Sequence, residues 1–289
     1  SFIETKQSEL DEWKEEEGKV SKGLEEIRLQ LSTLDQKEKF DQENLSRLRS
    51  EVKALQTEKD GIYESLAHSS EEMEKKQQMI TQLAGGMAVS TQIFVITLLF
   101  SLPLGLVIAF GRMSKNKLIQ TIVKVYISIM RGTPLMLQLM VVYFGPYYLF
   151  RIKVGSSYRL WATFIGFVIN YAAYFAEIYR SGIQSMPVGQ YEAAEILGYG
   201  KAQTFFKIIL PQVIKRILPS VTNEVITLVK DTSLAFTLSV AEMFSIAKAL
   251  AASQTNMMPF VAAAVFYYIF NLVVAVAMEW IEKKLDYYR

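Results

Sequence analysis

Two adjacent charges, Lys230 and Asp231, interrupt an apolar run and are followed by two hydroxyl side chains, Thr232 and Ser233. Each charge costs about 3 kcal/mol at the centre of a membrane helix on insertion scales. Neighbouring helical residues point about 100° apart, so the two charges face different surroundings. A solute with both a carboxylate and an ammonium group needs a cation and an acceptor, which is one reason to keep both charges. An ion network between helices explains the pair equally well.

A second set of polar side chains lies in the apolar run 160–180. Asn170, Tyr174 and Glu177 are spaced by four and then three residues, which places them on one face of a helix. Polar groups within a membrane span usually face the interior of a bundle or a water-filled path. This face is therefore a candidate passage for a solute. For Glu177 the favoured interpretation is an ion pair with Arg180 near the membrane interface.

The stretch 190–212 is polar, although it lies between apolar runs that are too long for a soluble core. It therefore lies at a membrane surface and faces a soluble partner. Glu192 favours the N-terminal end of a short helix, where exposed N–H groups have partial positive charge. Gly198 ends this helix, and Lys201 begins another that is expected to run to Pro211. A short helix with small residues and a glycine turn can bind in a cleft of another protein.

Five apolar runs are long enough to cross a bilayer core, which needs about 20 residues. They comprise residues 87–111, 118–150, 160–180, 219–240 and 259–282. Cationic residues follow the first run and the last run, which places the C-terminus inside the cell and the N-terminal segment outside. The cationic loop 151–159 departs from this pattern, because it is expected to be external. Residues 241–258 are interpreted as a re-entrant or interfacial stretch.

The phrase Arg131-Gly132-Thr133-Pro134 interrupts the second apolar run. Proline cannot donate a backbone hydrogen bond, so a break with freed carbonyl groups is expected there. For Arg131, capping these carbonyls or pairing with an acid is favoured over contact with a solute.

Net charge divides the chain into two expected domains, residues 1–84 and 85–289. The first contains 13 Lys and Arg against 20 Asp and Glu, and the second contains 18 against 9. The cationic residues of the second domain flank apolar runs, which indicates cytoplasmic loops near anionic membrane lipid and argues against nucleic acid. The chain has no cysteine, which excludes disulfides and thiolate metal sites.

The first domain has a heptad pattern. From Leu10 to Leu83 a 3-4 spacing defines 22 positions, of which 16 are apolar. The exceptions are Glu17, Glu38, Asp41, Lys59, Ser69 and Lys76. This pattern predicts a coiled coil, because an unpaired helix would leave its apolar stripe in water. A helical hairpin that turns at residues 60–61 or 68–70 is the alternative to pairing between chains, and residues 84–86 are expected to form a joint.

The stretch GQYEAAEILGYG, which begins at Gly189, resembles the EAA motif of ATP-binding-cassette importer permeases. Four further phrases in the family's order resemble its polar amino-acid branch: RGTPLMLQL from Arg131, AEIYRSGIQSMPVGQ from Ala176, ILPQVIKRILPSVTNE from Ile209 and VKDTSLA from Val229. The resemblance covers about residues 87–289 and does not include the first 84 residues.

The resemblance implies the type I importer permease fold. The expected chain is all-α, with a long N-terminal coiled coil followed by a five-helix polytopic membrane domain. Residues 189–200 are then the coupling helix, which docks into an ATPase subunit. The matching positions are Gly189, Gln190, Glu192, Ala193, Ala194, Leu197 and Gly198.

The resemblance also implies the partners. ATP and Mg bind to the partner ATPase, and this chain binds no cofactor of its own. A second permease chain completes the translocation path, which favours a homodimer with a parallel external coiled coil. An extracytoplasmic solute-binding protein delivers an amino acid, and the complex lies in the lipid of a bacterial cytoplasmic membrane.

Several other functions fit the sequence less well. The chain has no GxxxxGK[ST] phosphate loop, Cys/His cluster or nucleophile with a base, so a transport subunit and not an enzyme is expected. The alternative is a membrane-anchored coiled-coil scaffold without transport, but a scaffold needs neither a docking helix nor charges within the membrane. A secondary transporter is disfavoured by five spans without an internal inverted repeat.

Overall fold

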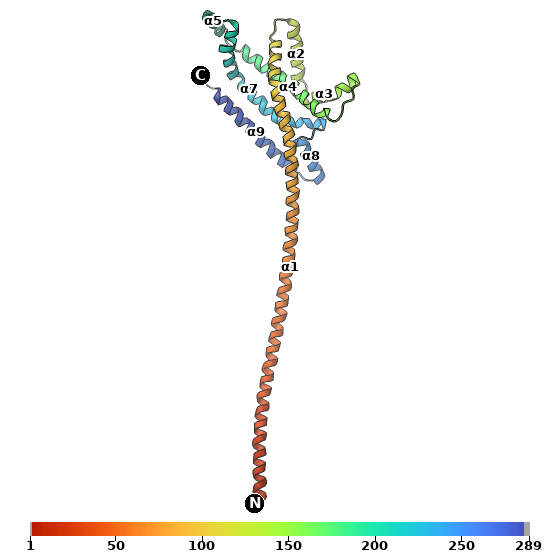
Figure 1. Cartoon of the computed structure of the whole chain (residues 1–289), viewed down its shortest axis with the longest axis vertical. Coiled ribbons are helices and arrows are strands. Elements are labelled where there is room, and N and C mark those ends of the chain that lie inside the picture. The colour runs from red at the N-terminus through yellow and green to blue at the C-terminus, as the bar shows by residue number, and fades with distance from the viewer. Residues whose placement is uncertain (1, 286–289) are drawn as a thin grey trace. The chain divides into compact units, whose positions relative to one another are not determined.

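The structure is a computed structural model that describes residues 2–285. The regular elements within this range are all helical (Figure 1). The chain divides into two compact units, residues 1–74 and residues 75–289. The described part of the first unit belongs to a single helix, so the core and the candidate site lie in the second unit.

Helix α1 (Phe2–Arg112) is continuous from the first unit into the second, with Pro103 inside it. Neither of the hairpin turns considered at residues 60–61 and 68–70 occurs. Within residues 2–74 every large apolar side chain is exposed, from 48% for Leu24 to 78% for Phe2. The heptad stripe is therefore uncovered in a single chain.

The joint predicted at Ala84-Gly85-Gly86 is wrong, because α1 runs through it without a break. A Cβ atom added to Gly86 would lie only 2.9 Å from the backbone N and Cα of Met243, the first residue of α8 (Met243–Gln254). Gly86 thus allows α1 to approach α8 closely. This packing outweighs a helix-propensity cost of about 1 kcal/mol for each glycine.

The same contacts explain where the unit boundary falls. Leu83 is fully buried and packs with Met243, Ala247 and Ala263, and Met79 packs against this group. Residues 75–84 therefore belong to the second unit, whereas the change in composition placed the boundary after residue 84.

We expect Gly86→Val to destabilise the second unit and Gly85→Val to leave it almost unchanged. A side chain at position 86 meets backbone atoms, and overpacking of this kind costs about 1–3 kcal/mol. A Cβ atom at Gly85 meets no atom within 4 Å. The thermal unfolding midpoints of the two detergent-solubilised variants test the difference. Equal midpoints would contradict the close contact between α1 and α8.

The remaining helices follow in chain order. Helices α2 (Lys117–Gly132) and α3 (Leu135–Phe150) flank a break at proline, and α4 (Tyr158–Gln184) follows a short loop. Next come α5 (Val188–Ile196), α6 (Lys201–Gln203), the π-helical segment η1 (Thr204–Ile209) and α7 (Leu210–Asp231). The 3-10 segment η2 (Thr232–Leu238), α8 and α9 (Met258–Lys284) complete the second unit.

Three described helices, α1, α4 and α9, are long and apolar enough to cross a membrane. The number rises to five if each of two bent pairs forms one span. One pair is α2 with α3, bent by 114°, which corresponds to the apolar run 118–150. The other joins residues 201–238 to α8 with a bend of 59°.

The helix expected to stop at Pro211 continues instead through α7 to Asp231. Pro211 directly follows the π-helical segment η1, where the backbone already departs from the α-helical hydrogen-bond pattern. The stretch interpreted as re-entrant or interfacial contains α8, which packs against α9.

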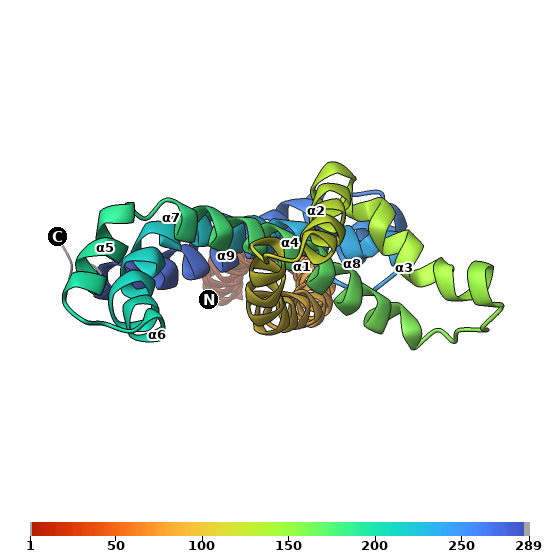
Figure 2. The same cartoon turned by 90° about the horizontal axis from the view of Figure 1, so that it is seen from above.

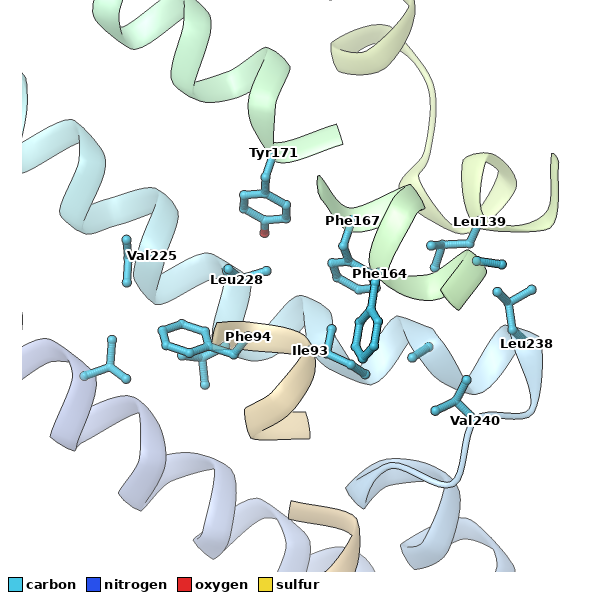
Figure 3. Close-up of a cluster of buried hydrophobic side chains, with 14 of the residues drawn as sticks. Ile93, Phe94, Leu139, Phe164, Phe167, Tyr171, Val225, Leu228, Leu238 and Val240 are labelled. Atoms are coloured by element: carbon cyan, nitrogen blue, oxygen red, sulfur yellow. The ribbon is translucent and has the colours of Figure 1, made fainter. Parts of the chain in front are cut away.

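The main core of the second unit lies where α1, α4 and α7 meet. Ile93 and Phe94 of α1 pack with Phe167 of α4 and Leu228 of α7, and all four are at least nine-tenths buried. Figure 3 shows these side chains converging between the helices. Tyr171 of α4 also belongs to this cluster, and its hydroxyl group points toward α7 (Figure 3). This tyrosine connects the apolar core to a polar site.

Candidate functional site

Two buried amide side chains bind the backbone carbonyl groups at the break between α2 and α3. Thr133 and Pro134 have extended backbone conformations, so nearby carbonyl groups lose their helical partners. The amide nitrogen of Gln138 donates to the carbonyls of Met130 and Thr133, each at 3.0 Å. The Asn170 amide donates to the Met130 carbonyl at 3.1 Å and to the Gln138 side-chain oxygen at 2.8 Å. These bonds tie α4 to the break.

Arg131 does not cap this break. Its guanidinium carbon lies 5.4 Å from the centre of the Tyr174 ring, in a cation–π contact between α2 and α4. The Arg131 side chain is exposed, so its N–H donors remain accessible. Glu177 forms an ion pair with Arg180, as the sequence favoured. Of the three polar residues predicted to share one face of α4, only Asn170 and Tyr174 line the cavity beside the break.

This cavity, which we call the polar pocket, has a volume of about 370 Å³. It lies between the break, α4, α7 and the start of η2. Its lining consists of Thr133, Pro134, Leu135, Asn170, Tyr171, Tyr174, Glu224, Thr227, Asp231 and Leu234. The lining therefore combines two carboxyl groups with hydroxyl and aromatic side chains, and Arg131 lies over one of its tyrosines.

Asp231 has a fixed position in the polar pocket. The hydroxyl group of Tyr171, a residue that is only 2% exposed, donates a 2.8 Å hydrogen bond to its Oδ2 atom. Glu224 lies seven residues earlier, so α7 presents both carboxyl groups on the same side. An arrangement of two acceptors facing a cavity suits a bound cation such as an ammonium group.

Lys230, Thr232 and Ser233 lie outside the polar pocket. Lys230 and Ser233 line a separate cavity of about 350 Å³ together with residues of α8 and α9. Thr232 is buried and donates its hydroxyl hydrogen to the Val229 carbonyl at 2.8 Å. The structure therefore separates the two adjacent charges, as expected for helical neighbours, and brings only Asp231 together with Asn170 and Tyr174.

The sequence-based candidates omitted four polar residues that the structure identifies. Tyr171, Gln138 and Glu224 build or line the polar pocket. The seven-residue spacing of Glu224 and Asp231 was a usable signal, because it places both on one face of a helix. Glu242 is fully buried and caps α8, accepting from the backbone N–H groups of Phe244 and Ser245 at 2.7 Å.

Helix α5 presents a separate surface at one end of the second unit, opposite the end occupied by α3 (Figure 2). Of the residues predicted for coupling, Ala194 is buried, and those exposed are Gly189, Gln190, Glu192, Ala193, Leu197 and Gly198. Ile196 and Leu197 are 86% and 73% exposed. Exposed apolar side chains that lie together are typical of interaction surfaces.

The turn after α5 gives this surface a defined shape. Gly198 has a φ of 80°, a conformation that side chains disfavour. Its N–H bonds the Glu195 carbonyl, and the Tyr199 N–H bonds the Ala194 carbonyl, at 2.9 and 3.0 Å. These paired bonds form a Schellman motif that closes the helix end. The predicted glycine stop is therefore present at Gly198.

Comparison with known proteins places this bundle in a family. Residues 101–287 match the family described as binding-protein-dependent transport system inner membrane component. The chain belongs to this family. Its members are transport permeases, so the membrane location and the permease role predicted from the sequence agree with this result.

Two curated permeases and one solved structure show the extent of the similarity. The L-cystine transport system permease protein TcyB of Bacillus subtilis is 34% identical over 208 residues, covering 71% of this chain and 87% of that protein. The arginine transport system permease protein ArtQ of the same organism is 34% identical over 201 residues, covering 69% and 90%. The crystal structure of an amino acid ABC transporter with histidines is 29% identical, with a TM-score of 0.65 and coverages of 74% and 97%. The importer permease fold is thus confirmed.

Proposed function

We propose that this permease moves amino acids across the cytoplasmic membrane as a subunit of an ATP-driven importer. The polar pocket is the observation that supports this proposal most directly, because it offers charged and polar groups inside a bundle of otherwise apolar helices. The named relatives transport L-cystine and arginine, and the solved relative is an amino acid transporter. A scaffold without transport would have no use for such a pocket.

The pocket's chemistry matches the groups that all free amino acids share. Glu224 and Asp231 can accept hydrogen bonds from an α-ammonium group, and the exposed Arg131 guanidinium can bind an α-carboxylate in a bidentate manner. The Asn170 amide nitrogen donates to Gln138 and to the break, so this side chain positions the pocket, and its oxygen can accept a hydrogen bond from solute. Tyr174 supplies the aromatic surface between the anionic and cationic sides.

The surface at α5 is the proposed binding site for the ATPase subunits, which hold ATP and Mg. Membership of the family implies such ATPases and a binding protein as partners. We further propose that two copies of this permease form the translocation path. In the proposed orientation, α5 and the C-terminus lie inside the cell, and residues 1–74 lie outside.

Uptake by the reconstituted complex tests this function. Proteoliposomes that contain this permease, its ATPase and the binding protein are expected to accumulate labelled amino acid only when ATP is supplied on the side that the ATPase faces. Glu192→Arg should abolish ATP-dependent uptake, because reversing the charge of an exposed α5 residue opposes docking. Lys153→Glu, a charge reversal in the loop after α3, is the matched control and should retain uptake. Absence of uptake by a correctly assembled wild-type complex, across all amino acids tested, would contradict the proposal.

A further inference from the structure

The uncovered apolar stripe of residues 10–80 is the largest feature that the transport function leaves unexplained. Its members include Leu10, Leu24, Leu45 and Leu66, each between 48% and 60% exposed. The stripe follows the a and d positions of heptads in which Leu10 is a and Trp13 is d. Leu83, the last member predicted, is buried within the second unit and is not available to a partner.

We propose that this stripe binds the same stripe of a second copy of the chain, as a parallel, two-stranded, in-register coiled coil. The inference rests on the proposed pairing of two permease chains. Both copies enter the membrane in the same orientation, so their N-terminal segments run in the same direction. A predominantly apolar heptad stripe is what each helix of such a pair requires to exclude water.

Each charged a residue faces its own copy in such a pair, and the neighbouring g residues offset this like-charge contact at two of the three charged a positions. In a parallel, in-register pair, the hole that receives an a side chain includes the preceding g residue of the other helix. Glu38 at an a position then lies beside the partner's Lys37, and Lys59 lies beside the partner's Glu58. Among the charged a positions, Glu17 is the exception, because the adjacent g residue is Glu16.

The flanking positions also suit this arrangement. A g residue of one helix faces the e residue five positions later on the other. From residue 9 to residue 77, these g–e pairs bring no two like charges together, and Glu9 with Lys14 forms an attractive pair. The charged Glu38 and Lys59 layers lower stability but disfavour shifts of one or two heptads, because such a shift would bury each charge beside an apolar layer.

Disulfide trapping tests the arrangement directly, because the chain has no cysteine of its own. Leu24→Cys and Leu66→Cys occupy a positions at two distant levels, and each should crosslink two full-length chains in native membranes under mild oxidation. A disulfide needs Cβ atoms about 3.5–4.5 Å apart, which an antiparallel pair cannot provide at both levels. Leu29→Cys is the matched control, since this leucine lies at an f position on the outer face and should remain monomeric on the gel.

The charged layers provide a second test. Lys59→Glu should slow crosslinking of Leu66→Cys several-fold, because the new carboxylate of each chain would then lie beside the partner's Glu58. The double variant Glu58→Lys, Lys59→Glu should restore the crosslinking rate, because residue 59 of each chain would again lie beside an opposite charge at residue 58 of the partner. An unchanged rate in the single variant would contradict the in-register pairing at this level.

The outcomes distinguish this inference from the proposed function. If neither Leu24→Cys nor Leu66→Cys crosslinks while the same preparations transport amino acid, the proposed coiled-coil pairing is wrong and the importer function stands. Crosslinking at only one level, or equally at the Leu29 control, would also overturn the parallel, in-register arrangement.

Discussion

Asp231→Asn is expected to lower amino-acid uptake about 30-fold or more while leaving the fold intact. Removing one partner of a buried, hydrogen-bonded charge pair costs about 2 kcal/mol or more, and each 1.4 kcal/mol is a factor of ten. The asparagine oxygen can still accept the hydrogen bond from Tyr171, so the packing of α4 against α7 is retained. The loss should therefore appear in uptake, measured at subsaturating amino acid, and not in the yield of assembled complex.

The neighbouring charge is the matched control for this prediction. Lys230 lines a different cavity from Asp231, so Lys230→Gln should change uptake by less than about threefold. Basal ATPase activity of both variants reports assembly with the ATPase independently of solute binding. If Lys230→Gln impairs uptake as strongly as Asp231→Asn, the assignment of these two charges to separate cavities is wrong for the transport cycle.

The contrast between these two residues illustrates what the sequence could and could not predict. Helical geometry alone indicated that Lys230 and Asp231 face different surroundings. Which of them faces Asn170 and Tyr174 could not be decided from the sequence, because that depends on how α4 and α7 pack. The hydrogen bond from Tyr171 of α4 to Asp231 of α7, 60 positions later in the chain, shows that Asp231 is the charge on the side of Asn170 and Tyr174.

Local rules succeeded where a single helix or turn determines the outcome. The heptad segment is helical, and Gly198 ends the coupling helix as expected. The same rules failed at Gly86, where low helix propensity predicted a joint but contact with Met243 determines the conformation. They also favoured, for Arg131, either capping of the break or pairing with an acid, and the capping is done instead by Gln138 and Asn170, which bind the freed carbonyls. Both failures occur where residues distant in sequence pack together.

Ile196→Asp is expected to weaken binding of the ATPase by at least about 100-fold. Ile196 lies at the exposed end of α5, beside the Schellman turn, and its side chain is 86% exposed in the single chain. Burying an isoleucine contributes about 1.5–3 kcal/mol, and an aspartate in its place would add an unpaired charge to the interface.

Ile152→Asp is the matched control, because Ile152 is also exposed, at 54%, but follows α3, and helix α3 lies at the opposite end of the second unit from α5 (Figure 2). Binding of purified ATPase to the detergent-solubilised permease, measured by titration, separates the two variants. The thermal midpoint of each permease should stay near that of the wild type, since neither side chain is buried in the single chain. Equal ATPase affinity of both variants would place the coupling surface elsewhere. In that case the turn fixed by Gly198 would have a structural role only, and the force for transport would enter the bundle through other residues.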